Sequence, residues 1–300
     1  MISVTKSRLN ELKKMLQEIE NGSIEEIKAE ICKTEADLQR YTTEAESLKI
    51  SANGSFGKFG NKWSILYAPD MMVQVTISGQ ICLLMLIEAI EQAGIPVISA
   101  NTDGILIQCP KARQGDLSGI ISAWEHTTGF TTEETLYRAV YAKDVNNYLA
   151  IKTNGEVKGK GLYSNPWEKP GRNVAKLQKN PQTTIVIEAV VALLRDGVPL
   201  RDTIEQSRDI TKFISVRTVT GGAQKEGVYV GKAIRWFYST DTLHSVMNYQ
   251  KSGNTVPKSD GSKPLMELPD EFPADVNYNW YVKEAQSVLH NLGYRQRTLF

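Results

Sequence analysis

Cysteine is scarce in this chain, and so is an excess of charge of either sign. The three cysteines, Cys32, Cys82 and Cys109, are far apart and odd in number, which argues against a disulfide framework or a zinc site and favours a reducing compartment. The 35 Lys and Arg balance 34 Asp and Glu to a net charge of +1, so the whole-chain balance gives no electrostatic sign of nucleic acid. An N-terminal signal core is lacking, and the longest apolar stretch, ending at Glu88, is too short to cross a bilayer. We therefore expect a soluble cytoplasmic protein with no membrane partner.

Apolar residues make up 41% of the chain, which is enough for a substantial core. Their helical spacing predicts one helix over residues 3–20 and a longer one over 24–56. Asn21-Gly22-Ser23 separates them as a turn, with Ser23 as the N-cap of the second helix. Two helices joined by so short a turn are expected to lie antiparallel, as a helical hairpin.

The middle of the chain mixes strand and helix signals. Pro69 begins a helix that Gly94 ends, and Asn154-Gly155 is a hairpin turn. The remaining predictions are strands at 63–67, 96–101, 104–109, 134–142, 145–152 and 156–163, and a helix at 114–127.

From residue 165 onward the pattern predicts helices at 182–196, 199–207 and 277–291, strands at 212–219 and 228–239, and a loop at 251–275. The predicted fold class is α+β, with an antiparallel helical hairpin, a partial antiparallel sheet and a mixed, mostly helical C-terminal region. The predicted parts are residues 1–57, 58–164 and 165–300.

The end of the long predicted helix carries a possible nucleotide-binding face. Lys49, Asn53 and Phe56 are spaced i, i+4 and i+7, so they project from one side of the helix. A cation suits phosphate oxygens, while an amide and a ring suit a sugar and a base. An ordinary helix end with a glycine cap explains the same residues.

Asp103 lies at the tip of a predicted hairpin between two strongly apolar strands. An Asp at a hairpin tip is commonly turn chemistry. A carboxylate held beside a buried surface is also well placed to bind a hard divalent cation.

Residues 143–179 form a basic segment, with eight Lys and Arg against three acidic residues, a local +5. Tyr148, Tyr163 and Trp167 are interleaved with them. Such a strip suits a surface that follows a nucleic-acid backbone, and chance clustering of surface lysines is the alternative.

The order of these three features resembles the family B DNA polymerases. KISANGSFG, beginning at Lys49, is similar to the fingers motif Lys-x-x-x-Asn-Ser-x-Tyr-Gly, and ISANTDGILI is similar to the palm motif Asp-Thr-Asp-Ser. KDVNNYLAIK followed by GEVKGKGLY resembles the region that holds the primer-template duplex, and KAIRWFYS and NWYVKEAQSVLHNLGY resemble thumb segments of phage members. The resemblance covers nearly all of the chain, as a C-terminal half made of fingers, part of the palm and thumb.

The resemblance implies nucleotidyl transfer with two Mg²⁺ ions, for which Asp103 is the catalytic, metal-binding carboxylate. It implies that Lys49 and Asn53 hold the incoming dNTP and that Phe56 and Gly57 lie beside the nascent base pair. Arg8 is the candidate for a basic residue that faces the phosphates, although its spacing to Lys13 is five rather than four.

Primer-template DNA is implied as the partner of Tyr148, Lys143, Lys158 and Lys160. Tyr148 resembles the tyrosine that contacts the primer strand. The family's basic residue two positions earlier is Asn146 here, which weakens that assignment.

Some family positions differ. Asn101 stands where the palm motif has its first Asp, Gly54 where the fingers motif has Ser, and Phe56 where it has Tyr. Nothing in residues 1–48 resembles the upstream motif Asp-x-x-Ser-Leu-Tyr-Pro, which carries the other catalytic Asp, or the exonuclease domain. One carboxylate cannot hold two Mg²⁺ ions at catalytic spacing. We therefore expect the chain to be inactive alone. It is either half of a split polymerase that needs a separate N-terminal fragment as its partner, or the product of a truncated gene.

Two other functions remain open on the sequence alone. A non-catalytic DNA-binding remnant or accessory protein would bind DNA without Mg²⁺ and gain no activity from a partner. A structural protein would bind no DNA.

Overall fold

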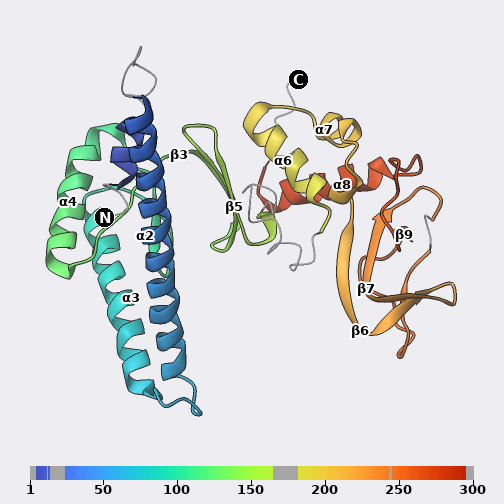
Figure 1. The fold of residues 1–300 in the computed structure, drawn as a ribbon, viewed down its shortest axis with the longest axis horizontal. Helices are drawn as coiled ribbons and strands as arrows, with labels where there is room; N and C mark the ends of the chain where they lie inside the picture. The colour runs from blue at the N-terminus through green and yellow to red at the C-terminus, as the bar shows by residue number, and fades with distance from the viewer. Residues whose placement is uncertain (1–4, 12, 14–23, 165–181, 243–244, 295–300) are drawn as a thin grey trace. The chain divides into compact units, whose positions relative to one another are not determined.

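Two compact units make up the chain, Met1–Phe130 (unit 1) and Thr131–Phe300 (unit 2), and each has its own core. The computed structural model describes residues 5–11, 13, 24–164, 182–242 and 245–294 (Figure 1). Both units combine helices with antiparallel strands, so the predicted α+β class is confirmed. The boundary between the units falls inside the predicted middle part, residues 58–164, and the three-part division stays a prediction.

Unit 1 follows the predicted order of elements. In chain order these are α2 (Ile24–Phe59), α3 (Pro69–Gln92), β1 (Val97–Asn101), β2 (Gly104–Ile107), a 3₁₀ turn (Lys111–Arg113) and α4 (Gln114–Thr128). α3 begins with Pro69 in its first turn, where proline is well tolerated. The chain leaves α3 through Gly94, whose φ of +72° favours glycine. The helices predicted at 24–56, 69–92 and 114–127 are confirmed, as is the hairpin around Thr102-Asp103.

The first predicted helix is described only at residues 5–11 and 13, which are helical. The turn predicted at residues 21–23 lies outside the described residues. Arg8 pairs with Glu30 at 3.1 Å and Lys13 pairs with Glu35 at 2.8 Å. In an antiparallel pair of helices, a residue further along the first helix contacts a residue earlier on the second. Here Lys13 comes five residues after Arg8, and its partner Glu35 comes five residues after Glu30. These contacts therefore lack the register of the predicted antiparallel hairpin.

The strand predicted at residues 63–67 is wrong, because this segment is a series of turns in the loop between α2 and α3. Asn61 Oδ1 accepts a hydrogen bond from the N–H of Trp63 at 3.0 Å, and Ser64 Oγ accepts one from the N–H of Leu66 at 3.0 Å. Such local bonds satisfy backbone groups that a strand would pair with a neighbour. The alternation of apolar residues carried no information about whether a partner strand was present.

The core of unit 1 is small and lies at the C-terminal half of α3. Leu86 and Ile90 of α3 pack with Ile95 and with Leu117 of α4, and β1 and β2 cover part of this cluster. Trp124 of α4 donates its indole N–H to the carbonyl of Cys82 at 2.7 Å. The first half of α3 lies outside this cluster and has no buried residue.

Among the helices that the structure describes, α3 alone is long and apolar enough, by length and composition, to cross a membrane. The prediction that no apolar stretch is long enough to cross a bilayer was therefore wrong in terms of length and composition. It considered only the apolar run ending at Glu88, whereas uncharged Gln, Thr, Ser and Gly extend the run from Met71 to Ile87.

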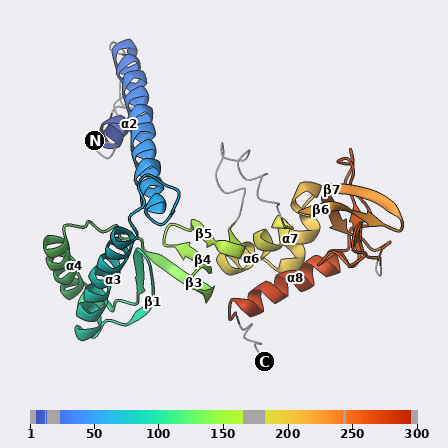
Figure 2. The ribbon, with the colours of Figure 1, turned by 90° about the horizontal axis from the view of Figure 1, so that it is seen from below.

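Unit 2 contains two antiparallel sheets and a group of helices (Figures 1 and 2). The strands are β3 (Tyr137–Asp144), β4 (Asn147–Lys152), β5 (Val157–Lys160), β6 (Ser215–Lys225), β7 (Val228–Tyr238), β8 (Asn248–Tyr249) and β9 (Ser262–Pro264). The helices are α6 (Thr184–Asp196), α7 (Leu200–Gln206) and α8 (Tyr278–Asn291), with 3₁₀ turns at Gly161–Tyr163 and Ile210–Lys212. The sheet orders are β3-β4-β5 and β8-β6-β7-β9.

One core cluster runs through unit 2 and joins both sheets to α6 and α8. Several boundaries in unit 2 differ from the prediction, and β9 lies inside the predicted loop at 251–275. The last strand of the first sheet ends at Lys160, because Gly161 turns the chain with a φ of +65°. β6 continues beyond the predicted end at residue 219, through Gly221 and Gly222, where the pairing with β7 is irregular.

Candidate functional site

The predicted nucleotide-binding face lies on the last three turns of α2. Because the helix is continuous to Phe59, Lys49, Asn53 and Phe56 project from one side of it. Lys49 and Asn53 are exposed, and Phe56 is half-buried with its ring edge-on to Phe59 at a centroid distance of 6.5 Å. The face therefore offers an exposed cation, an exposed amide and a half-buried ring in a row.

Gly57 lies inside the helix rather than at its end, which comes two residues later. A Cβ on Gly57 would have no heavy atom within 4 Å. The open space beside this backbone is compatible with the predicted close approach of a ligand.

The predicted palm carboxylate lies at the tip of the β1–β2 hairpin. Asn101 pairs with Gly104, so Thr102 and Asp103 form a two-residue turn. The side-chain oxygen of Asn101 accepts hydrogen bonds from the N–H of Thr102 at 2.9 Å and from its hydroxyl at 3.1 Å. Asn101 therefore serves the turn, while Asp103 is exposed.

Within the described residues, no hydrogen bond or ion pair brings Asp103 together with Lys49 or Asn53. No group of three or more His, Cys, Asp or Glu side chains that could hold a metal ion occurs in this part of the chain. Two Mg²⁺ ions need bridging carboxylates and additional oxygen ligands. The described residues thus do not fit a two-metal site by themselves, and Asp103 can supply one ligand group.

Arg8 is engaged by two carboxylates. Its guanidinium lies 3.1 Å from Glu30 on α2 and 3.4 Å from Glu11 on its own helix. The hydrogen bond to Glu30, followed by its charge, raises the pKa of Arg8 above its usual value. To face a triphosphate, Arg8 would have to leave these partners.

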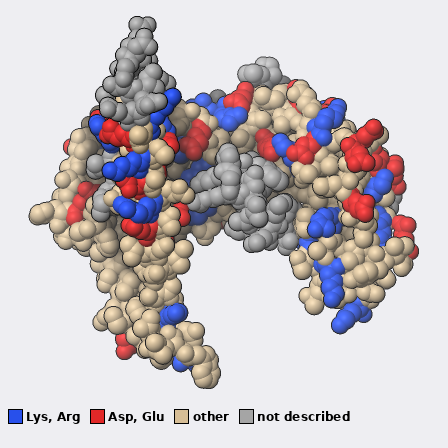
Figure 3. Space-filling view, in the orientation of Figure 1, with Lys and Arg blue, Asp and Glu red and all other residues tan. Residues whose placement is uncertain are grey.

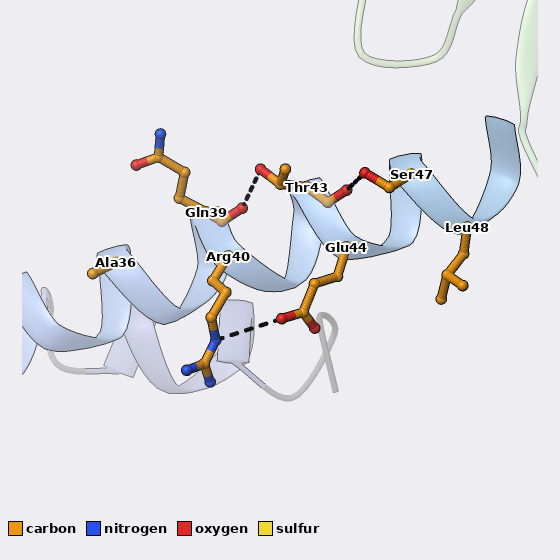
Figure 4. Close-up of a pocket in the computed structure, with 7 residues that line it drawn as sticks. All are labelled: Ala36, Gln39, Arg40, Thr43, Glu44, Ser47 and Leu48. Carbon is orange, nitrogen blue, oxygen red and sulfur yellow. Dashed lines mark hydrogen bonds and ion pairs between the residues drawn. The ribbon is translucent and has the colours of Figure 1, made fainter. Parts of the chain in front are cut away.

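A pocket on α2 is lined by residues of that helix alone: Ala36, Gln39, Arg40, Thr43, Glu44, Ser47 and Leu48 (Figure 4). Arg40 lies 3.9 Å from Glu44, and the hydroxyls of Thr43 and Ser47 donate to carbonyls one turn earlier. None of the predicted site residues lines it. With its cation paired and its hydroxyls committed to the helix, the pocket offers little to a nucleotide.

The predicted DNA-binding residues lie on the β3-β4-β5 sheet. Lys160 pairs with Tyr148, and Lys158 pairs with Ala150, so Tyr148, Lys158 and Lys160 share one face of the sheet. The ammonium of Lys160 lies 6.0 Å from the centre of the Tyr148 ring. The opposite face, with Leu149, packs into the core of unit 2. Three of the four predicted residues are therefore brought together on an outward-facing surface.

Lys143 lies beside this group, at an irregular point of the β3–β4 pairing between Ala142 and Asp144. It is exposed. Lys152, which also belongs to the predicted strip, pairs with Glu156 at 2.6 Å, and Tyr163 is buried in the core of unit 2. The basic residues from Lys169 to Lys179, and Trp167, lie outside the described residues.

Asn147 organises this end of the sheet and was not predicted. Its side-chain NH₂ donates to the Asp144 carboxylate at 2.9 and 3.0 Å, and its side-chain oxygen accepts from the N–H of Leu162 at 2.9 Å. These bonds from Asn147, followed by one from the N–H of Asn146, lower the pKa of Asp144. One amide thus fixes the β3–β4 turn to the turn that follows β5. Only the sequence Asp-x-x-Asn, typical of a turn, could have indicated this role.

Comparison with known proteins finds partial similarity to DNA polymerases. No protein-family model matches the chain. It is 25% identical over 170 residues to DNA polymerase 1 of Aeropyrum pernix, covering 53% of this chain and 17% of that protein. It is 25% identical over 125 residues to DNA polymerase 1 of Saccharolobus solfataricus, covering 41% of this chain and 14% of that protein.

Among solved structures, the family B DNA polymerase of the archaeon Pyrobaculum calidifontis aligns with 99% of this chain and 38% of its own. The TM-score is 0.48 and the sequence identity 13%. The chain spans less than a fifth of the length of the curated relatives that it matches. Over part of its length, the chain is therefore similar to archaeal DNA polymerases.

Proposed function

We propose that this chain is the fingers, part of the palm and the thumb of a family B DNA polymerase of phage type. In this proposal it extends a DNA primer along a template only when assembled with a polypeptide that supplies the exonuclease domain and the other catalytic carboxylate. A cytoplasmic location belongs to the same proposal.

The observation that carries the proposal is the order of three local features. A helical face with Lys49, Asn53 and Phe56 is followed by α3, and α3 by a hairpin with an exposed Asp103 at its tip. A sheet face with Tyr148 and paired lysines comes next along the chain. The partial similarity to archaeal DNA polymerases supports a polymerase-related chain.

Each residue has a role in this proposal that its surroundings permit. Lys49 neutralises triphosphate charge, Asn53 holds phosphate or sugar, and Phe56 with Gly57 borders the nascent base pair. Asp103, exposed and without an ion pair to a described residue, is the carboxylate that this chain contributes to the Mg²⁺ site. Arg8 is kept as a weaker candidate for the phosphates, because its guanidinium is paired with Glu30.

The DNA-binding part of the proposal concerns unit 2. Lys158 and Lys160 lie on the face of Tyr148, so they can contact successive backbone phosphates while the phenol borders the primer strand. Lys143 extends this surface at the turn.

Primer extension tests the proposal. A primed DNA template with Mg²⁺ and dNTPs is given the chain alone, or the chain with a polypeptide made of the residues of the Aeropyrum pernix polymerase that lie outside the matched segment. Extension in the mixture only, abolished by Asp103→Asn, is expected. Extension by the chain alone would show that a second metal ligand lies within the 300 residues.

A second candidate function is non-catalytic DNA binding, which the lack of a metal-ligand cluster in the described residues favours. It predicts salt-sensitive DNA binding that needs no Mg²⁺ and no extension in any mixture. DNA binding that persists while the mixture stays inactive would replace the first proposal with this one.

A further inference from the structure

α3 exposes an unusual amount of apolar surface. Eight of its apolar side chains are 37–59% exposed: Met71, Met72, Val73, Val75, Ile77, Ile81, Leu84 and Met85. No charged residue occurs between Asp70 and Glu88. Val73, Ile77, Ile81 and Leu84 recur at intervals of four, four and three, so they form a continuous stripe, here called the α3 stripe. Leu86 and Ile90, which enter the core, lie on the opposite side of the helix.

The surroundings of the α3 stripe are also poor in charge. Figure 3 shows that the end of unit 1 where α2 joins α3 is mostly uncharged on the face in view. The connecting loop exposes Trp63 and Ile65 almost completely. Scattered apolar side chains are normal on a protein surface, but a contiguous patch marks a surface that something else covers.

The β1–β2 hairpin also has no neighbouring strand among the described residues. Within the described residues it is a sheet of two strands, so both of its outer edges are unpaired. Val97, Ile105 and Ile107 pack toward α3 and α4, whereas Ile98 is 56% exposed. Strands that are apolar on both sides are typical of the interior of a larger sheet, and a lone hairpin is marginally stable.

A bilayer does not fit this surface. α4 packs along the second half of α3 and carries Asp116 and Glu125, which would enter the hydrocarbon with it. The uncovered first half, about 12 residues, is about 18 Å long at 1.5 Å per residue, whereas the hydrocarbon core is about 30 Å thick.

We infer that the α3 stripe and an edge of the β1–β2 sheet together form the docking surface for the polymerase polypeptide outside these 300 residues. The inference rests on the proposed function. Its occupant is a chain that lays an apolar face on the stripe and adds a strand to the hairpin. In the curated relatives, more than four fifths of the polypeptide lies outside the matched segment, so covering chain is available in the same molecule.

A binding measurement that needs no catalysis tests the inference. The full chain is titrated with the polypeptide from the Aeropyrum pernix polymerase described above, by analytical ultracentrifugation. Ile77→Lys and Ile81→Lys place a charge on the stripe, and their side chains are 47% and 53% exposed, so the helix itself should form. Each is expected to raise the Kd about tenfold or more, equivalent to about 1.4 kcal/mol per factor of ten.

Met266→Lys is the matched control, because Met266 is 68% exposed in unit 2. It and Asp103→Asn should bind like the unaltered chain. Binding without primer extension would refute the proposed function and leave the docking surface intact. Extension with equal binding by all variants would refute the docking surface and leave the function intact.

Three other results would overturn the inference. The unaltered chain could fail to bind the polypeptide. It could instead dimerise in a way that Ile77→Lys abolishes, which would make a second copy the occupant. It could also co-sediment with phosphatidylcholine vesicles through the same side chains, which would make a lipid surface the occupant.

Discussion

Tyr281 of α8 is the residue whose loss should most clearly separate hydrogen bonding from packing in unit 2. Its side chain is fully buried. The hydroxyl donates to the carbonyl of Phe213 at 2.9 Å and accepts from the N–H of Tyr238 at 2.9 Å. Tyr281→Phe keeps the ring, which lies edge-on to Phe213 at 5.0 Å, and removes only the oxygen.

The expected cost follows from the two backbone groups that lose their partner. Each buried, unpaired N–H or C=O costs about 1–3 kcal/mol, so we expect a loss of about 3 kcal/mol in the free energy of unfolding after some relaxation. For a unit of this size, that lowers the Tm by about 6–12 °C. Differential scanning calorimetry, followed at the transition of unit 2, measures the change.

Tyr278→Phe is the control for Tyr281→Phe. The ring of Tyr278 also lies edge-on to Phe213, at 6.3 Å, but its hydroxyl makes no hydrogen bond to a described residue. A loss below about 0.5 kcal/mol is expected for it. If both variants lose the same stability, the hydroxyl of Tyr281 does not bridge the two backbone groups and the reasoning is wrong.

Three further changes test the site and its support. Replacing both Lys158 and Lys160 by Gln should lower the slope of log Kd against log salt for DNA by about 1.8, measured by fluorescence anisotropy, and an unchanged slope would remove both from the interface. Gly161→Ala should destabilise unit 2 more than Gly227→Ala in urea unfolding, because both have positive φ but only at Gly161 would the new Cβ lie 2.3 Å from a backbone oxygen. Burial raises the pKa of Tyr238 to about 12, so the folded chain keeps a proton that the unfolded chain loses near pH 10. Stability should therefore be complete below pH 10 and fall as the pH rises toward 12. Tyr238→Phe should make this fall smaller by about 3 kcal/mol, while Tyr281, whose pKa burial also raises, still contributes to it.

Local signals predicted most elements because their causes are local. Pro69 and Gly94 delimit α3 by backbone geometry alone, and the two-residue turn at Thr102-Asp103 needs only its flanking strands. The segment at residues 63–67 has the composition of a strand but no partner, and pairing cannot be read from one segment.

The candidate site likewise has parts that the sequence could predict, because they depend on local geometry, and parts that it could not, because they depend on how strands pair. Spacing placed Lys49, Asn53 and Phe56 on one face, because a helix converts sequence distance into direction. The contact of Asn147 with the turn after β5 joins residues 15 positions apart, and it depends on how three strands pair. No periodicity in the chain could predict it.

The neutral charge of the whole chain conceals two different surfaces. On the N-terminal helices, acidic and basic side chains neutralise each other in pairs such as Arg8 with Glu30 and Lys13 with Glu35. On the β5 strand, no ion pair joins Lys158 or Lys160 to a carboxylate of a described residue. Exposed ion pairs contribute little to stability but cancel the field that a phosphate would meet. A net charge near zero therefore does not argue against nucleic-acid binding here, because Lys158 and Lys160 keep a local positive charge on the Tyr148 face of the β3-β4-β5 sheet.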